Sequence, residues 1–198
     1  MKVQMQPLRD LAKVEKRIIA AAKASFPGGF DRWTALDTVN HACSWKLSAC
    51  GKVESRARGE DARYHADKPL EDLNRQYYEE ARGRSRPETI AAVDLALAAE
   101  AEVLEAIDGR QSSAELAPIG FEGAVSDYLA LDLIFHPISH YSYYAIRNDE
   151  YEVFLEVERF VAKYRSSAFA DLSVMDVKGL ADARAVKEIF DRGYEWQH

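Results

Sequence analysis

The stretch from Thr34 to Arg58, TALDTVNHACSWKLSACGKVESRAR, decides the fold class of this chain. Thr34 is followed three residues later by Asp37, which resembles a helix-starting capping box with Asp in place of the usual Glu. Apolar side chains then recur at helical spacing, so the pattern predicts a helix from Ala35 to about Arg58. Its buried stripe is expected to contain Val39, Ala42, Cys43, Leu47, Cys50 and Val53.

Helical patterns continue on both sides of this stretch. Upstream, an amphipathic helix is expected from about Leu8 to Ser25, and the sequence FPGG at residues 26–29 stops it. Downstream, a shorter helix begins near Pro69, and a longer one runs from Pro87, with Ser85 as its cap, to about Ile107. Further helices are expected over residues 124–147, 150–164 and 182–192, the first of them interrupted by Pro137.

No run of residues is convincing as a strand, so the chain is expected to be all-α. Four long helices and smaller additions predict a helical bundle in a single domain of 198 residues. The core bundle is expected over about residues 8–147. Residues from about 149 to 198 are expected to form a C-terminal helical appendage.

Charge and composition exclude several classes of function. The net charge of −7 argues against sequence-independent binding to nucleic acid and against docking on an anionic membrane. The first residues do not resemble a signal peptide, and no apolar stretch approaches about 18 residues, so a cytoplasmic protein is expected. Cys43 and Cys50 are separated by about 10.5 Å along a helix, too far for a disulfide, so both are expected to be reduced and buried.

Three of the five histidines form a candidate metal site. His136 and His140 are four residues apart, which puts them on one face of a helix, one turn apart. His41, midway along the helix that begins at Ala35, is the candidate for a third ligand. Neutral imidazole suits a divalent zinc, nickel or iron ion, and three protein ligands leave a position for water or substrate. Alternatively, the histidines are core or pocket side chains without a metal.

Other side chains share the helix faces of these histidines. Asp37 and Trp45 lie on the face of His41, and Asp132 and Tyr144 lie on the face of His136 and His140. Either aspartate is a candidate for orienting an imidazole, although Asp37 equally suits a purely capping role. The two aromatic residues could line a substrate pocket or simply pack the core.

Pro137 complicates the pair of histidines. It cannot donate a backbone hydrogen bond to the carbonyl of Leu133, and it disfavours helical backbone angles at His136. A kink at this position is therefore expected.

Two motifs give the chain a family resemblance. The run Trp-Thr-Ala-x-Asp-x-x-x-His-x-x-x-Trp from residue 33, followed by His136-x-x-x-His140, resembles the DinB-like superfamily of bacterial four-helix bundles. The segment from residue 72 to residue 107 resembles the corresponding part of ClbS/DfsB-type members. In DinB-like proteins one histidine of the second helix and two of the fourth bind a divalent metal, which implies His41, His136 and His140 here.

The resemblance implies several functions and does not choose among them. DinB-like members include transferases that use bacillithiol or mycothiol, a maleylpyruvate isomerase branch and ClbS-type proteins that protect cells from a reactive natural product. We expect a metal-dependent hydrolase or thiol transferase that acts on a small electrophilic molecule. The alternatives are a bundle that sequesters a small molecule without turnover and a homodimeric interaction module.

Overall fold

The computed structural model describes residues 3–22, 28–30, 32–64 and 68–164. These residues form helices, turns and two isolated β-bridges, so the all-α class is confirmed for the described part of the chain. The helices are α1 (Met5–Ala21), α2 (Ala35–Ala57), α3 (Leu70–Ala81), α4 (Arg86–Ala106), α5 (Val125–Ala130), η1 (Leu131–Phe135), α6 (His136–Arg147) and α7 (Tyr151–Tyr164). The helix expected over 182–192 lies outside the described residues.

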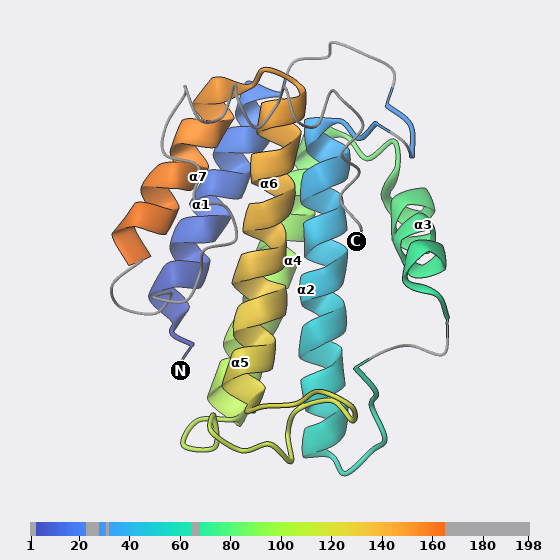
Figure 1. Ribbon diagram of the computed structural model, residues 1–198, viewed down its shortest axis with the longest axis vertical. Coiled ribbons are helices and arrows are strands. Elements are labelled where there is room, and N and C mark those ends of the chain that lie inside the picture. The colour runs from blue at the N-terminus through green and yellow to red at the C-terminus, as the bar shows by residue number, and fades with distance from the viewer. Residues whose placement is uncertain (1–2, 23–27, 31, 65–67, 165–198) are drawn as a thin grey trace.

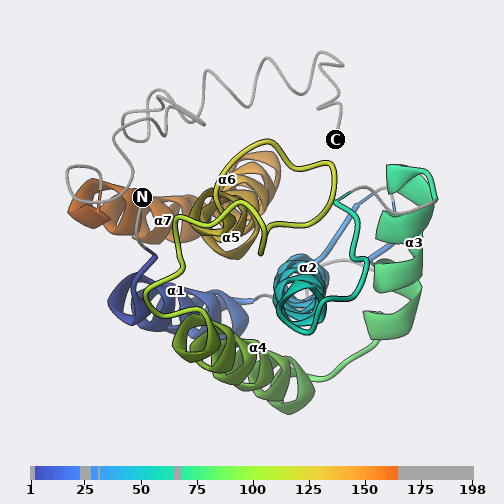
Figure 2. The same cartoon turned by 90° about the horizontal axis from the view of Figure 1, so that it is seen from below.

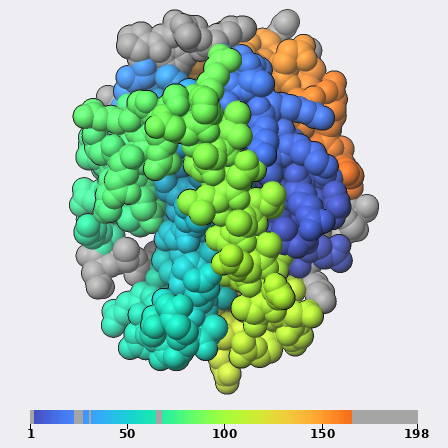
Figure 3. Space-filling view, turned by 180° about the vertical axis from the view of Figure 1, so that it is seen from behind, coloured from blue at the N-terminus to red at the C-terminus, as the bar shows by residue number. Residues whose placement is uncertain are grey.

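Helices α1, α2, α4 and the continuous rod α5–η1–α6 surround a common core (Figures 1 and 2). Figure 3 shows α4 along the back of the molecule, between α1 on one side and α2 with α3 on the other. Leu8, Ile18, Val39, Leu129 and Tyr141 are among the core side chains that are at most 1% exposed. Since each rod buries an apolar stripe against its neighbours, burial of apolar surface stabilises the arrangement.

The starts of α2 and α4 follow the expected capping chemistry. The backbone N–H of Asp37 donates to Oγ of Thr34, and the N–H of Thr34 donates to the Asp37 carboxylate at 2.9 Å. Ser85 and Glu88 form the same reciprocal pair at the start of α4. These capping boxes satisfy backbone donors that the first helical turn leaves without a partner, so both predicted starts are confirmed.

The rod that carries His136 and His140 contains a π-helical segment, which the sequence did not predict. In η1 the backbone N–H of His136 donates to the carbonyl of Leu131, five residues earlier. Pro137 therefore lies in the first turn of α6, where a missing backbone N–H costs nothing. The expected loss of helical angles at His136 is wrong, since φ is −57° and ψ is −52° there, and the wider turn of η1 accommodates the proline.

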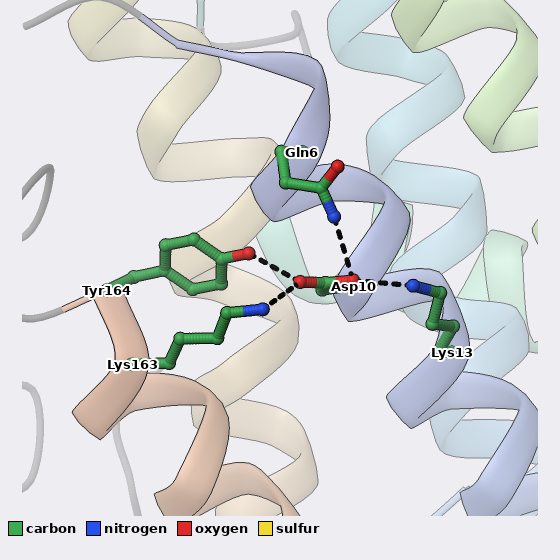
Figure 4. Close-up of polar contacts among 5 residues, drawn as sticks. All are labelled: Gln6, Asp10, Lys13, Lys163 and Tyr164. Atoms are coloured by element: carbon green, nitrogen blue, oxygen red, sulfur yellow. Dashed lines mark hydrogen bonds and ion pairs between the residues drawn. The ribbon is translucent and has the colours of Figure 1, made fainter.

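Helix α7 packs against α1 and α6 through Val153, Phe154, Val157 and Phe160. Its last turn is tied to α1 at Asp10, which accepts hydrogen bonds from Tyr164 at 2.5 Å and Lys163 at 2.6 Å (Figure 4). Lys13 and Gln6 of α1 donate to the same carboxylate. This part of the expected appendage therefore extends the core formed by the preceding helices.

Helix α3 lies on the outer side of α2, away from α1 (Figure 2). Only Asn74, Tyr78 and Ala81 of α3 are buried, and these side chains face the bundle. Among the described helices, none is both long and apolar enough to cross a membrane.

Candidate metal centre

The three predicted histidines meet between α2 and the rod that ends in α6. One ring nitrogen from each of His41, His136 and His140 lies within 4.8 Å of the other two. The Nε2 atoms of His136 and His140 are 2.7 Å apart, as the spacing of four residues on one helix face predicted. His41 and His140 are buried, and His136 is half-buried. The fold thus brings together side chains that are separated by almost a hundred positions in the sequence.

The distances are compatible with a single bound ion. Zinc or a similar ion binds imidazole nitrogen at about 2.0–2.1 Å, so two ligand atoms of one ion lie roughly 3.0–3.4 Å apart. The 2.7 Å separation of His136 and His140 needs to widen by roughly half an ångström to reach this range. Small rotations of the rings suffice for such a change. Three neutral imidazoles form a donor set that suits zinc, nickel or iron and leaves one or more positions for another ligand.

Trp33 covers one side of the histidine cluster. Its ring centroid lies 4.3 Å from that of His41 and 5.6 Å from that of His140, and the last pair is stacked with an interplanar angle of 25°. The segment that carries Trp33 approaches the start of α2 closely at Gly28. A Cβ atom at Gly28 would lie only 2.7 Å from the Asp37 carboxylate, so a larger residue here would displace the capping side chains of α2.

Trp45 borders the cluster from α2, one turn after His41. Its ring centroid lies 5.2 Å from that of His136 and 5.4 Å from that of Tyr77 on α3. The indole N–H donates to Oδ1 of Asn74 at 3.1 Å, and both side chains are buried. Helix α3 is therefore fixed to α2 directly beside the histidines, and its aromatic side chains become part of their surroundings.

Asp37 has the capping role that the sequence left open. One carboxylate oxygen of Asp37 accepts hydrogen bonds from both the N–H and the hydroxyl of Thr34. Tyr144 is buried in the hydrophobic core, and burial raises the pKa of its phenol to about 12. Its hydroxyl is therefore protonated at any physiological pH.

Asp132 is the remaining acidic residue of the predicted set. It lies in η1, one turn before His136, and is 6% exposed. Burial raises the pKa of its carboxyl to about 6, although Tyr128 and the cation of Lys52 both act to lower it. Lys52 is half-buried, and burial lowers its pKa. A carboxyl with this pKa exchanges protons near neutral pH, but its role as a partner of an imidazole stays a prediction.

Sequence reasoning missed the contribution of α3 to this site. Tyr77 and Tyr78 were not singled out, because two adjacent tyrosines in a polar segment give no periodic signal. Tyr78 stacks on Trp33 with an interplanar angle of 8°, and Phe30 packs edge-on against Tyr78. These tyrosines contact the tryptophans at positions 33 and 45 only in the folded chain, so the sequence alone held no signal that could have placed them at the site.

Comparisons with protein-family models, with curated proteins and with solved structures found no significant match to this chain.

Proposed function

We propose that this chain binds one divalent metal ion through His41, His136 and His140 and acts as a metal-dependent enzyme on a small electrophilic molecule. The observation that carries the proposal is the convergence of three imidazole nitrogens within 4.8 Å from two separate helices. Packing three polar rings together, two of them buried, carries a desolvation cost, which metal coordination would offset. The DinB-like resemblance of the same three positions supports this assignment.

When bound, such an ion supplies a Lewis acid and lowers the pKa of a coordinated water or thiol. The residues of the chain hold the histidines in place and restrict access to them. Trp33 and Trp45 contact the imidazole rings from two directions, and burial of this kind excludes bulk water from a site.

The attacking group would come from outside the chain. Cys43 and Cys50 are buried, and burial raises the pKa of both thiols, so neither is available as a thiolate. Water or a low-molecular-weight thiol is then the nucleophile. The two matching reaction classes are hydrolysis and thiol transfer, and both suit detoxification of an electrophile.

A second candidate function is sequestration of a small molecule without turnover, as in the ClbS/DfsB-type alternative. The aromatic side chains that contact one another around the histidines favour it, because stacked rings bind planar apolar groups. These side chains are Phe30, Trp33, Trp45, Tyr77 and Tyr78.

The first experiment is elemental analysis and titration of tag-free protein with zinc, nickel and ferrous ions. We expect about one ion per chain for the wild type, and a loss of affinity of at least about 100-fold for His140→Ala. His198→Ala, which changes a histidine outside the predicted set, is the matched control and should keep its metal. The proposal is wrong if the wild type takes up none of the three ions or if His140→Ala binds them as tightly.

The second experiment separates the two functions. Wild type loaded with metal is assayed with 1-chloro-2,4-dinitrobenzene, with and without a low-molecular-weight thiol. Turnover that disappears in His140→Ala supports the enzyme. Saturable quenching of tryptophan fluorescence by the same compound, without turnover in either condition, supports sequestration.

A further inference from the structure

A second polar cluster lies in the core where α1, α2, α4 and α6 meet. The ammonium of Lys46 on α2 is 2.8 Å from Oε1 of Glu15 on α1 and 3.3 Å from Oε1 of Glu100 on α4. The hydroxyl of Tyr141 on α6 donates to the same oxygen of Glu15 at 2.6 Å. All four residues are at most 1% exposed. Two carboxyl groups and a single ammonium are thus shut away from water.

The two carboxyl groups are held very differently. Glu15 accepts hydrogen bonds from both Lys46 and Tyr141. Neither oxygen of Glu100 has a hydrogen-bond partner among the described residues, and its only close cation is the lysine that Glu15 already engages. A buried carboxylate without hydrogen bonds is costly, whereas a protonated carboxyl is neutral and carries no such electrostatic cost.

Within the part of the chain that the structure describes, no second positive charge lies close to Glu100. If both glutamates were ionised, the cluster would carry a net charge of −1 in a medium of low dielectric constant. Burial raises the pKa of Glu100 to about 7 in spite of the attraction of Lys46, and the charge of Glu15 raises it further. The titratable groups that interact with Glu100 are Glu15 from α1, Cys43, Lys46 and Cys50 from α2, and Tyr141 from α6.

The other members of the cluster are poor sites for an exchangeable proton. Burial lowers the pKa of Lys46, but Glu100 and Glu15 outweigh this effect and raise it overall, so the ammonium keeps its proton. Burial raises the pKa of Tyr141 and of both cysteines, which therefore stay neutral. These four groups therefore do not change the charge of the cluster near neutral pH.

We propose that Glu100 is a buried proton-binding site. Its carboxyl keeps one proton in the folded bundle at pH values at which the unfolded chain has already released it. The unfolded carboxyl gives up its proton near its ordinary pKa of 4.5, whereas the folded one keeps it to a higher pH. Between these limits the folded state binds more protons than the unfolded state. Stability is therefore highest at the acidic end of the interval, falls as the pH rises through it, and levels off above it.

The test measures urea unfolding of the full chain at several pH values between 5 and 8.5. A chelator is present throughout, so that metal binding at the histidines does not contribute. The variant Glu100→Gln carries a neutral side chain of the same size, and Glu102→Gln changes an exposed glutamate on the same helix. We expect the unfolding equilibrium constant of the wild type to rise at least about tenfold across this range relative to Glu100→Gln. Glu102→Gln should follow the wild type.

The proposal is overturned if wild type and Glu100→Gln change in parallel with pH, because the extra proton then does not reside on Glu100. A second measurement on unmutated protein covers the case in which Glu100→Gln does not fold. Carbon-13 NMR of the glutamate side-chain carboxyls should show one resonance that titrates near neutral pH. If every resonance titrates near the ordinary value, the proposal fails as well, whatever the metal site does.

Discussion

Replacing Lys46 by methionine tests how much the bundle depends on its buried cation. The change keeps an unbranched side chain, shorter by one heavy atom, and removes the charge that lies 2.8 Å from Glu15 and 3.3 Å from Glu100. Removing one partner of a buried ion pair typically costs about 3–5 kcal/mol, because the remaining charge has neither solvent nor a counter-ion. We expect a loss of this size at pH 8, above the pKa of Glu100.

The loss should be smaller at pH 5. At this pH Glu100 is neutral even when Lys46 is present, so the lysine interacts with one carboxyl less. Glu15 also keeps the hydrogen bond from Tyr141. One pKa unit corresponds to about 1.4 kcal/mol, so a difference of roughly 1–3 kcal/mol between the two pH values is expected. The destabilisation of Lys46→Met should therefore grow as the pH rises through the titration of Glu100.

The assay is urea denaturation followed by circular dichroism at both pH values. Lys16→Met is the matched control, because Lys16 pairs with Asp94 on the surface and both side chains are well exposed. An exposed pair contributes at most about 1 kcal/mol. A cost of less than about 1 kcal/mol for Lys46→Met at pH 8, or a cost that does not depend on pH, would contradict this role of the buried cation.

Three further substitutions test other contacts. Tyr141→Phe removes the hydrogen bond to buried Glu15 and should lower the free energy of unfolding by about 1–3 kcal/mol in chemical denaturation. Trp45→Phe leaves the buried amide of Asn74 without its donor, so hydrogen exchange in α3 should become faster, with a cost of about 1 kcal/mol; unchanged exchange would contradict the contact. Asp10→Asn should lower the melting temperature at neutral pH, because Lys13 first and then Lys163 and Tyr164 hold the pKa of this carboxyl well below 3.8. That contribution is present above pH 3.8 and is lost as the pH falls, so the difference in melting temperature from the wild type should shrink in acid.

The helices and the histidine site were largely predictable from sequence. The two residues of each capping pair, which begin at Thr34 and Ser85, lie three positions apart. A local sequence pattern is therefore sufficient to predict the starts of α2 and α4. The spacing of His136 and His140 likewise determines their proximity once a helix is assumed. His41 could be added because its helix was predicted and no other histidine lay on a long helix.

The buried ion cluster could not be predicted in the same way. Glu15, Lys46 and Glu100 are charged, and charged residues in amphipathic helices are ordinarily assigned to the solvent face. Their burial depends on three helices that meet from positions more than thirty residues apart. Each charge is tolerated only because the others are present, and no single segment contains that information.

The π-helical segment was missed for a related reason. Pro137 signalled that the hydrogen-bond pattern must change, but a kink and a π-turn both satisfy this requirement. The choice between them is made by packing. The side chains before η1 and those after it must both meet the core, and the rings of His136 and His140 must meet His41.

At the level of the gene, a π-turn is equivalent to one codon inserted into an α-helix. One residue corresponds to about 100° of rotation, so deleting any single residue of η1 would turn α6 by roughly that angle relative to α5. The histidine pair would then be directed away from α2, although both residues would still be encoded. Homologous sequences therefore need a one-residue gap before Pro137 wherever a relative lacks this turn, and an ungapped comparison would place the two histidines out of register.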